Sequence, residues 1–254
     1  MTGGRRRFTV SLPDFGQAGP EPIYPGDMRE AYQIRLNDLG DHGAQMCQVA
    51  SDALRDATNA LLTADLQLAE KVIATDVQLD EMRANAETVA LDILALQAPV
   101  ASDLRAVISA LWIVADLQRM GALAMHVAKA ARRRHPAPVV PVEVRPIFER
   151  MGRVGVHLAD QATQLLRERD VVLARAIETE DDLMDDLHQE MFAALLSPDW
   201  AHGVGPAIDL SLLGRFYERF ADHAVSVARR VVFLVTGENV GGDTTPAALT
   251  SPER

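Results

Sequence analysis

The spacing of apolar side chains along this chain is that of long amphipathic helices. From Met28 onward, apolar residues recur mostly three, four or seven positions apart, and no segment of consequence alternates with the period of a strand. A period near 3.6 gathers these residues on one face of a helix, which packs against other helices. Together with capping residues and proline breaks, the pattern predicts six helices. The first is at about 28–61, and the second runs from 65 to the turn at Pro99. The other four are at about 102–134, 143–169, 170–196 and 206–236.

The predicted helix ends carry signals of their own. Asp65 fits the N-cap of the second helix, and either Ser102 or Asp103 fits that of the third. Gly237 fits the C-terminal cap of the last helix. The basic cluster 132–134 closes the third helix, where cations oppose the negative end of the helix dipole. We therefore interpret this cluster as a stabilised helix end rather than a binding patch.

The chain contains an internal repeat. The segment 65–82 is similar to 170–187, and the segment 112–128 is similar to 212–228. The first pair of segments matches at a difference of 105 in residue number, and the second pair at a difference of 100. Each copy of a duplicated unit is expected to bury its own core. The repeat therefore predicts an all-α protein made of two tandem, similar three-helix bundles.

Proline and glycine residues mark the boundaries of these parts. The first 27 residues hold four prolines and five glycines with little periodicity, and three prolines fall between the two repeats. We predict a flexible N-terminal arm at 1–27, a first three-helix bundle at 28–134, a proline-rich linker at 135–141, a second three-helix bundle at 142–236 and a disordered tail at 237–254.

Composition narrows the classes of function. Hydrophobic residues make up 48% of the 254 residues but aromatic ones only 5%, so aliphatic side chains must fill the core. A net charge of −11 without a broad basic face argues against a nucleic-acid partner. The single cysteine, Cys47, excludes an intramolecular disulfide and is expected in the core. Without a signal peptide or an apolar run of about 20 residues, we expect a cytoplasmic protein that does not insert into a membrane.

Acidic residues four positions apart are the candidate chemistry. Such residues share one helix face, where like charges destabilise the helix by about 0.2–0.5 kcal/mol per pair. A cation would offset this repulsion, and facing carboxylates from neighbouring helices hold metals in helical bundles. Solvation, or ion pairs with Arg215 and Arg219, would also satisfy these acids, but recurrence in both halves favours a metal. The pairs are Asp76 with Asp80, Asp181 with Asp185, and Glu218 with Asp222.

Two histidines lie close to these acids in the sequence. His188 follows Asp185 by three residues, and His223 directly follows Asp222. Imidazole is a common metal ligand, so either ring could join a site. A lone histidine on a helix surface is more often only solvated, which is the reading we favour for both.

The last helix carries residues of a known family signature. From Arg215 to Ala228 it reads Arg-Phe-Tyr-Glu-Arg-Phe-Ala-Asp-His-Ala-Val-Ser-Val-Ala, and Phe-Leu-Val-Thr-Gly-Glu follows from Phe233 to Glu238. Together with the repeat and the two Asp-x-x-x-Asp pairs, this resembles the PhoU family of phosphate-signalling regulators. The usual form of that signature is close to Leu-Glu-Arg-Ile-Gly-Asp-His-Ala. The resemblance covers roughly residues 28 to 240.

The resemblance implies a cytoplasmic negative regulator of phosphate uptake and of the phosphate-starvation response. Its partners would be the phosphate ABC transporter ATPase and a sensor histidine kinase, and we also expect a homodimer. No nucleophile, phosphate loop or nucleotide fingerprint is evident, so we expect no catalysis. Some family members bind multinuclear iron or zinc clusters. The implied ligands here are Asp76, Asp80, Asp181, Asp185, Glu218 and Asp222.

The first repeat departs from the family pattern. Where Glu-Arg-x-Gly-Asp is expected, residues 118–122 read Gln-Arg-Met-Gly-Ala, so an amide and a methyl group replace two carboxylates. Asp116 is the nearby acid that could offer a displaced oxygen. The second-half set is therefore the only one that looks complete, and we expect the first half to bind metal poorly or not at all.

Two other readings remain open. A ferritin-like di-metal protein needs Glu-x-x-His motifs on two helices, and only residues 185–188, which read Asp-Asp-Leu-His, approach this pattern. The duplicate position, 80–83, ends in arginine. A metal-free helical adaptor, whose acidic faces are only solvated, is the third reading. Metal analysis of protein purified without chelator, together with an oxidase assay, separates the three.

Overall fold

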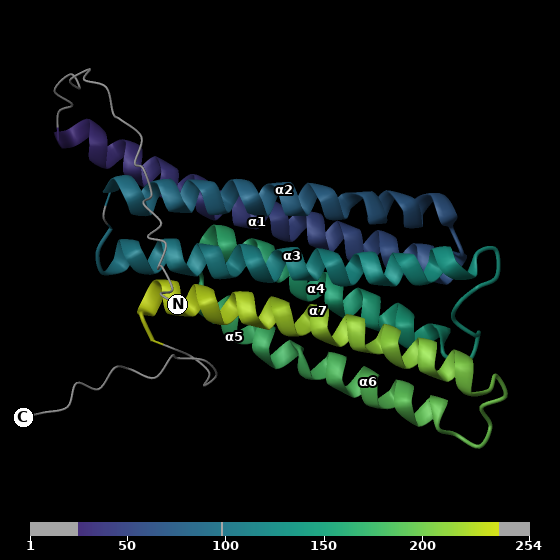
Figure 1. Cartoon of the computed structure of the whole chain (residues 1–254). Coiled ribbons are helices and arrows are strands. Elements are labelled where there is room, and N and C mark those ends of the chain that lie inside the picture. The colour runs from purple at the N-terminus through teal and green to yellow at the C-terminus, as the bar shows by residue number, and fades with distance from the viewer. Residues whose placement is uncertain (1–24, 98, 239–254) are drawn as a thin grey trace, which may run out of the picture.

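The fold is an elongated array of helices whose axes run nearly along one direction (Figure 1). The computed structural model describes residues 25–97 and 99–238, and within them it contains no strand. This confirms the all-α prediction. The helices are α1 (Pro25–Thr63), α2 (Leu66–Gln97), α3 (Ser102–Arg134), α4 (Arg145–Glu168), α5 (Val171–Glu180), α6 (Asp182–Leu195) and α7 (Val204–Thr236).

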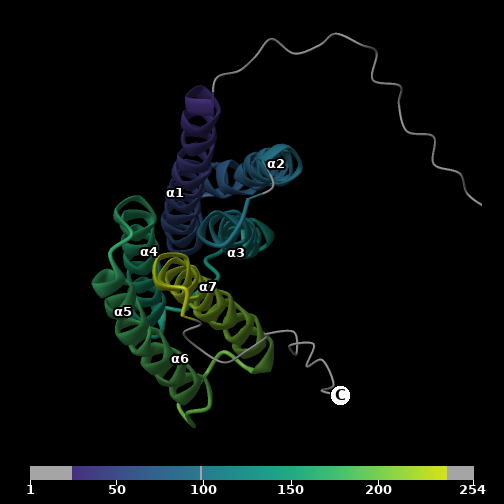
Figure 2. The same cartoon turned by 90° about the vertical axis from the view of Figure 1, so that its left-hand side faces the viewer.

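The tandem arrangement is confirmed, but the two halves share one core. The first bundle is α1, α2 and α3, and the second is α4, α5 with α6, and α7 (Figures 1 and 2). Helix α1 packs on α3 and α4, and α7 packs on α3 and α4, so these four form a central layer. The buried apolar side chains make one continuous cluster across it. The expectation that each copy buries its own core was therefore too simple.

Several helix ends are where the sequence signals place them. The backbone N–H of Leu68 donates to the Asp65 carboxylate at 3.0 Å, and that of Val172 donates to Asp170 at 2.8 Å, so both repeats use the same N-cap. Gly237 ends α7 with φ of 78°, a conformation that glycine adopts without strain. The prediction for α3 was wrong. Ala101 occupies its N-cap without a side-chain hydrogen bond, because the helix already begins at Ser102.

The long fifth helix predicted at 170–196 is divided at Asp181 into α5 and α6. The carbonyl of Asp181 accepts from the N–H of Met184 at 2.8 Å and from that of Asp185 only at 3.4 Å. The chain therefore tightens to a three-residue bond at this point. The apolar spacing continues through the break, which is why the pattern alone did not reveal it.

Other boundaries shift by a few residues. Helix α1 begins at Pro25, so residues 25–27, assigned to the N-terminal arm, are helical. The rest of that arm and the tail beyond Glu238 lie outside the described residues. The predicted linker lies between α3 and α4, whose first residue is Arg145.

Helix α3 contains a long apolar window. Among the described residues, this is the one helix whose length and composition would allow it to cross a membrane. Half of its most apolar window (50%) is buried inside the protein. It lies against α1, α2 and α7, so packing in the bundle accounts for its composition. The cysteine prediction is confirmed on α1, where Cys47 is fully buried and burial raises the pKa of its thiol to about 12.

The halves approach closely where α4 crosses α1. The hydroxyl of Thr58 on α1 donates to the Leu54 carbonyl at 2.8 Å and lies 3.0 Å from the hydroxyl of Tyr217 on α7. Gly152 on α4 faces this group. A Cβ atom at Gly152 would lie 2.5 Å from Cγ2 and 2.8 Å from Oγ1 of Thr58, too near for either to remain in place.

Valine at position 152 is therefore expected to destabilise the protein. Gly152→Val would push α4 away from Thr58, and overpacking of this kind costs about 2 kcal/mol. Gly43→Ala on α1 is the matched control, because its Cβ would lie 3.7 Å from Ile113 Cγ2, an ordinary contact. Alanine in a helix interior should raise stability by about 0.5–1 kcal/mol. Urea unfolding of both variants measures whether valine lowers and alanine raises the free energy of unfolding. A valine that stabilised the protein would contradict the close approach of α4 to Thr58.

Candidate functional site

The second-half acidic residues meet where the junction of α5 and α6 packs on α7. Asp181 lies at the junction and Asp185 one turn later on α6, while Glu218 and Asp222 lie on α7. Burial, followed by the charges of Asp222 and Asp185, raises the pKa of Asp181 to about 6. Burial and the charge of Glu218 raise the pKa of Asp222. The predicted set therefore comes together, and its mutual repulsion is only partly relieved.

Glu218 is largely enclosed within this acidic cluster. Its side chain is 17% exposed, and its Oε1 atom accepts from Arg215 on the same helix. Its Oε2 atom lies 3.3 Å from His188 Nδ1, but the geometry makes no hydrogen bond. Both Glu218 Oε2 and His188 Nε2 are buried without a hydrogen-bond partner. His188 is thus half-buried beside the cluster rather than solvated.

The first-half residues form a different arrangement. Gln118 on α3 donates its Nε2 hydrogen to Asp80 Oδ1 at 2.9 Å, at the position that corresponds to Glu218 in the second repeat. An amide donor satisfies this carboxylate where the second half presents another charge. Asp76 keeps one buried oxygen without a partner. The structure thus places Asp76 and Asp80 on one helix, with an amide in place of the facing acid.

Asp116 and His223 belong to another cluster that sequence reasoning missed. Asp116 is 5% exposed, and its two oxygens lie 3.1 Å from His223 Nδ1 and 2.7 Å from Arg230 Nε. Both partners lie on α7, so this cluster joins the two halves. Asp116 therefore does not face the first-half acids, and His223 is buried rather than solvated. Residues more than 100 apart in sequence make these bonds, and no local pattern marks them.

The donor chemistry of the second-half cluster fits a cation. Four carboxylates offer oxygen ligands, His188 offers a nitrogen, and one buried carboxylate oxygen has no partner. The side chains are not arranged as a finished site, since no group of three or more His, Cys, Asp or Glu within residues 25–97 and 99–238 is placed to hold a metal ion. Side-chain rotation would have to complete the coordination.

Comparison with known proteins identifies the family. The family model described as the PhoU domain matches residues 44–131 and again residues 148–231. The chain belongs to the PhoU family. The two matches coincide with the two halves of the structure, so the PhoU domain occurs twice in tandem.

Relatives in this family are similar over nearly their whole length. The chain is 51% identical over 221 residues to the phosphate-specific transport system accessory protein PhoU homolog 1 of Mycobacterium leprae, covering 87% of this chain and 100% of that protein. It is 53% identical over 210 residues to PhoU homolog 2 of Mycobacterium tuberculosis, covering 83% and 99%. The crystal structure of PhoU from Pseudomonas aeruginosa has a TM-score of 0.72 at 27% identity, covering 82% and 100%.

A more distant PhoU structure agrees on the fold. The crystal structure of the phosphate transport system regulatory protein PhoU from Streptococcus pneumoniae matches with a TM-score of 0.74 at 24% identity, covering 83% of this chain and 99% of that one. The tandem helical architecture of PhoU therefore extends to this chain. The recognition of the family from its α7 signature is confirmed.

Proposed function

We propose that this protein is a cytoplasmic negative regulator of phosphate uptake and of the phosphate-starvation response. It would act on the phosphate ABC transporter through the transporter ATPase and pass the state of the transporter to a sensor histidine kinase. The observation that carries the proposal is the PhoU domain in both halves, together with about 50% identity to phosphate-transport accessory proteins over nearly their full length.

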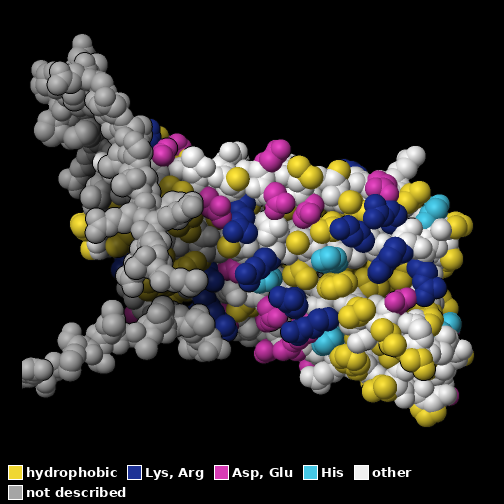
Figure 3. Space-filling model, in the orientation of Figure 1, with side chains coloured by type: hydrophobic (Ala, Val, Ile, Leu, Met, Phe, Trp, Pro, Cys, Tyr) yellow, Lys and Arg dark blue, Asp and Glu magenta, His cyan; other side chains and the backbone are white. Residues whose placement is uncertain are grey.

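An exposed apolar patch supports a role in protein contacts. At one end of the molecule, where α6 meets the start of α7, apolar side chains gather on the surface (Figure 3). Leu196 is 81% exposed, Val204 75% and Ile208 55%, around a hollow of about 580 Å³. Contiguous exposed apolar surface marks protein contact sites. We assign this α6–α7 patch to contact with the transporter ATPase or the kinase, in a protein that acts as a homodimer.

The second-half acidic cluster is the proposed metal site. Asp181, Asp185, Glu218 and Asp222 would hold a multinuclear iron or zinc cluster, and His188 is placed to assist. The metal would supply positive charge that neutralises the carboxylates and ties α5 and α6 to α7. The role of the chain would be to hold α5 and α6 against α7 in one arrangement.

A metal-free adaptor is the second candidate. It is favoured by the Gln118 to Asp80 hydrogen bond, which satisfies a carboxylate without a cation, and by the lack of a finished ligand set in the described residues. The ferritin-like reading has less support, because the ring of His188 faces Glu218 on α7 and Phe192 on its own helix, not a second Glu-x-x-His motif.

Loss of this protein is expected to derepress phosphate-starvation genes while phosphate is plentiful. A reporter for those genes, measured in a deletion strain at high phosphate, should rise several-fold and return to its basal level with the intact gene. A gene carrying Leu196→Asp with Ile208→Asp should fail to restore repression, because charges on the α6–α7 patch would block the partner. Unchanged reporter expression in the deletion strain would overturn the regulatory role.

A further inference from the structure

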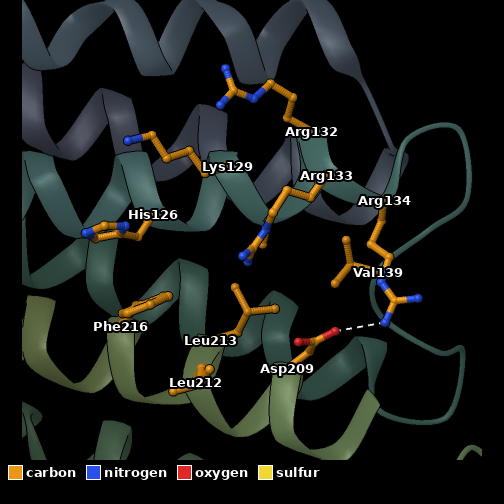
Figure 4. Close-up of a pocket in the computed structure, with 11 residues that line it drawn as sticks. His126, Lys129, Arg132, Arg133, Arg134, Val139, Asp209, Leu212, Leu213 and Phe216 are labelled. Carbon is orange, nitrogen blue, oxygen red and sulfur yellow. Dashed lines mark hydrogen bonds and ion pairs between the residues drawn. The ribbon is translucent and has the colours of Figure 1, made fainter. Parts of the chain in front are cut away.

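A basic hollow lies between the end of α3 and the first half of α7 (Figure 4). Its volume is about 420 Å³, and it lies next to the apolar patch along the first turns of α7, sharing Leu212 with it. The α3 side carries the basic residues His126, Lys129 and the arginines at 132–134. The α7 side is mainly apolar and contributes a single acid, Asp209.

The positive charge of this hollow is only partly compensated. Arg134 pairs with Asp209 at 2.8 Å, and Arg132 turns toward Glu70 on α2 at 3.4 Å. Lys129 and Arg133 have no carboxylate within 4.0 Å among the described residues. Arg133 points from α3 toward α7 across the hollow (Figure 4). In a chain with net charge −11, this is a local excess of cations that a helix end does not require.

The rest of the lining suits an apolar ring system. The rings of His126 and Phe216 stack at one end with centroids 5.2 Å apart, and Leu213 and Val139 line the hollow beside them. Flat aromatic faces of this kind bind the bases of nucleotides by stacking. A volume of about 420 Å³ falls in the range of pockets for organic ligands and is far larger than one phosphate ion needs.

We propose that this hollow binds an organic polyphosphate of nucleotide type. Its phosphate groups would lie on Lys129 and Arg133, where the guanidinium can donate two hydrogen bonds to one phosphate. Its ring system would lie against His126 and Phe216. The inference does not rest on the regulatory role, because it needs no partner protein and no metal at the acidic cluster. It replaces our interpretation of residues 132–134 as a helix end only.

Calorimetric titration of the full chain tests the proposal. The probes are ATP, pyrophosphate, inorganic phosphate and adenosine, each with EDTA present so that no metal at the acidic cluster can bridge the phosphates. ATP should bind most tightly, and pyrophosphate should bind more tightly than inorganic phosphate or adenosine. ATP that fails to bind, or that binds no better than inorganic phosphate, would overturn the assignment.

Matched variants separate a built site from general charge. Lys129→Ala with Arg133→Ala should weaken ATP binding by at least about tenfold, since two charge-assisted contacts are lost. Arg153→Ala with Arg175→Ala removes the same charge from two exposed positions outside the hollow and should leave affinity unchanged. Phe216→Ala should weaken ATP but not pyrophosphate. If both double variants lost ATP affinity equally, with circular dichroism unchanged, binding would reflect only general electrostatic attraction, and the site would be refuted.

Discussion

Replacing Asp116 with alanine is expected to lower the free energy of unfolding by about 3 kcal/mol. Its carboxylate is buried between α3 and α7, where an ionised acid can only accept, so His223 Nδ1 and Arg230 Nε both donate to it. Alanine would leave these donors facing each other without an anion. Because the bonds join the two halves, the loss weakens the central layer itself.

Urea unfolding measures this loss against a matched exposed pair. Arg83 and Glu87 also form an ion pair at 2.7 Å, but both side chains are about 40% exposed on α2. Glu87→Ala should therefore cost less than about 0.5 kcal/mol. If the two alanine variants were equally stable, the buried cluster would contribute no more than a surface pair.

The same carboxylate should make stability depend on acid pH. Burial alone would raise the pKa of Asp116, but hydrogen bonds from His223 and Arg230 outweigh it and hold the pKa below the usual 3.8. A lowered folded-state pKa contributes stability that is present above about pH 4 and is lost as pH falls through the folded value. Below pH 4, the parent protein should therefore lose stability more steeply than Asp116→Asn. Identical acid profiles would show that Asp116 does not titrate in this way.

Metal binding is expected to depend on the second half alone. At a free metal concentration of 100 times the dissociation constant, zinc or ferrous iron should stabilise the parent protein by about 2.7 kcal/mol. Glu218→Ala with Asp222→Ala should remove most of this gain, whereas Asp76→Ala with Asp80→Ala should change it little. Gln118 already satisfies Asp80 by a hydrogen bond, so the first half has less unrelieved charge to offer a cation.

Thermal unfolding with and without added metal checks this asymmetry. In metal-free protein, the raised pKa of Asp181 means that stability falls as pH rises from about 4 through about 6, because the ionised form is disfavoured. Bound metal should abolish that fall. Equal losses from the two double variants would refute the asymmetry, and no stabilisation of the parent protein by metal would leave the acidic cluster as charged surface.

Local features of the fold could be predicted from the sequence, and distant ones could not. The helices follow from apolar spacing, and Asp65 and Gly237 cap them through atoms only a few residues away. The four second-half acids were expected together because two of them share each helix face. Asp116 and His223 were misread because their bond joins residues 107 apart in sequence. Such contacts depend on how α3 and α7 pack, which one sequence does not specify.

The basic hollow was missed for a related reason. The basic residues at 132–134 are sufficiently explained as cations that stabilise a helix C-terminus, so the sequence pattern did not indicate a binding site. The opposite wall, with Phe216 and Asp209, comes from the other repeat. Likewise, the break at Asp181 leaves the apolar period intact, and only the backbone hydrogen bonds reveal it.

The shared central layer also bears on how the two copies could diverge after duplication. Each of α1, α3, α4 and α7 touches both repeats, so a change in the layer disturbs both copies at once and is strongly constrained. Within the described residues, α2 packs only on α1 and α3, whereas α5 and α6 pack only on each other, α4 and α7. The contacts of these outer helices therefore lie within one copy each. Gln118 meets Asp80 where α2 packs on α3, a contact within the first copy, so an amide in place of a carboxylate there leaves the equivalent Glu218 of the second copy unaffected.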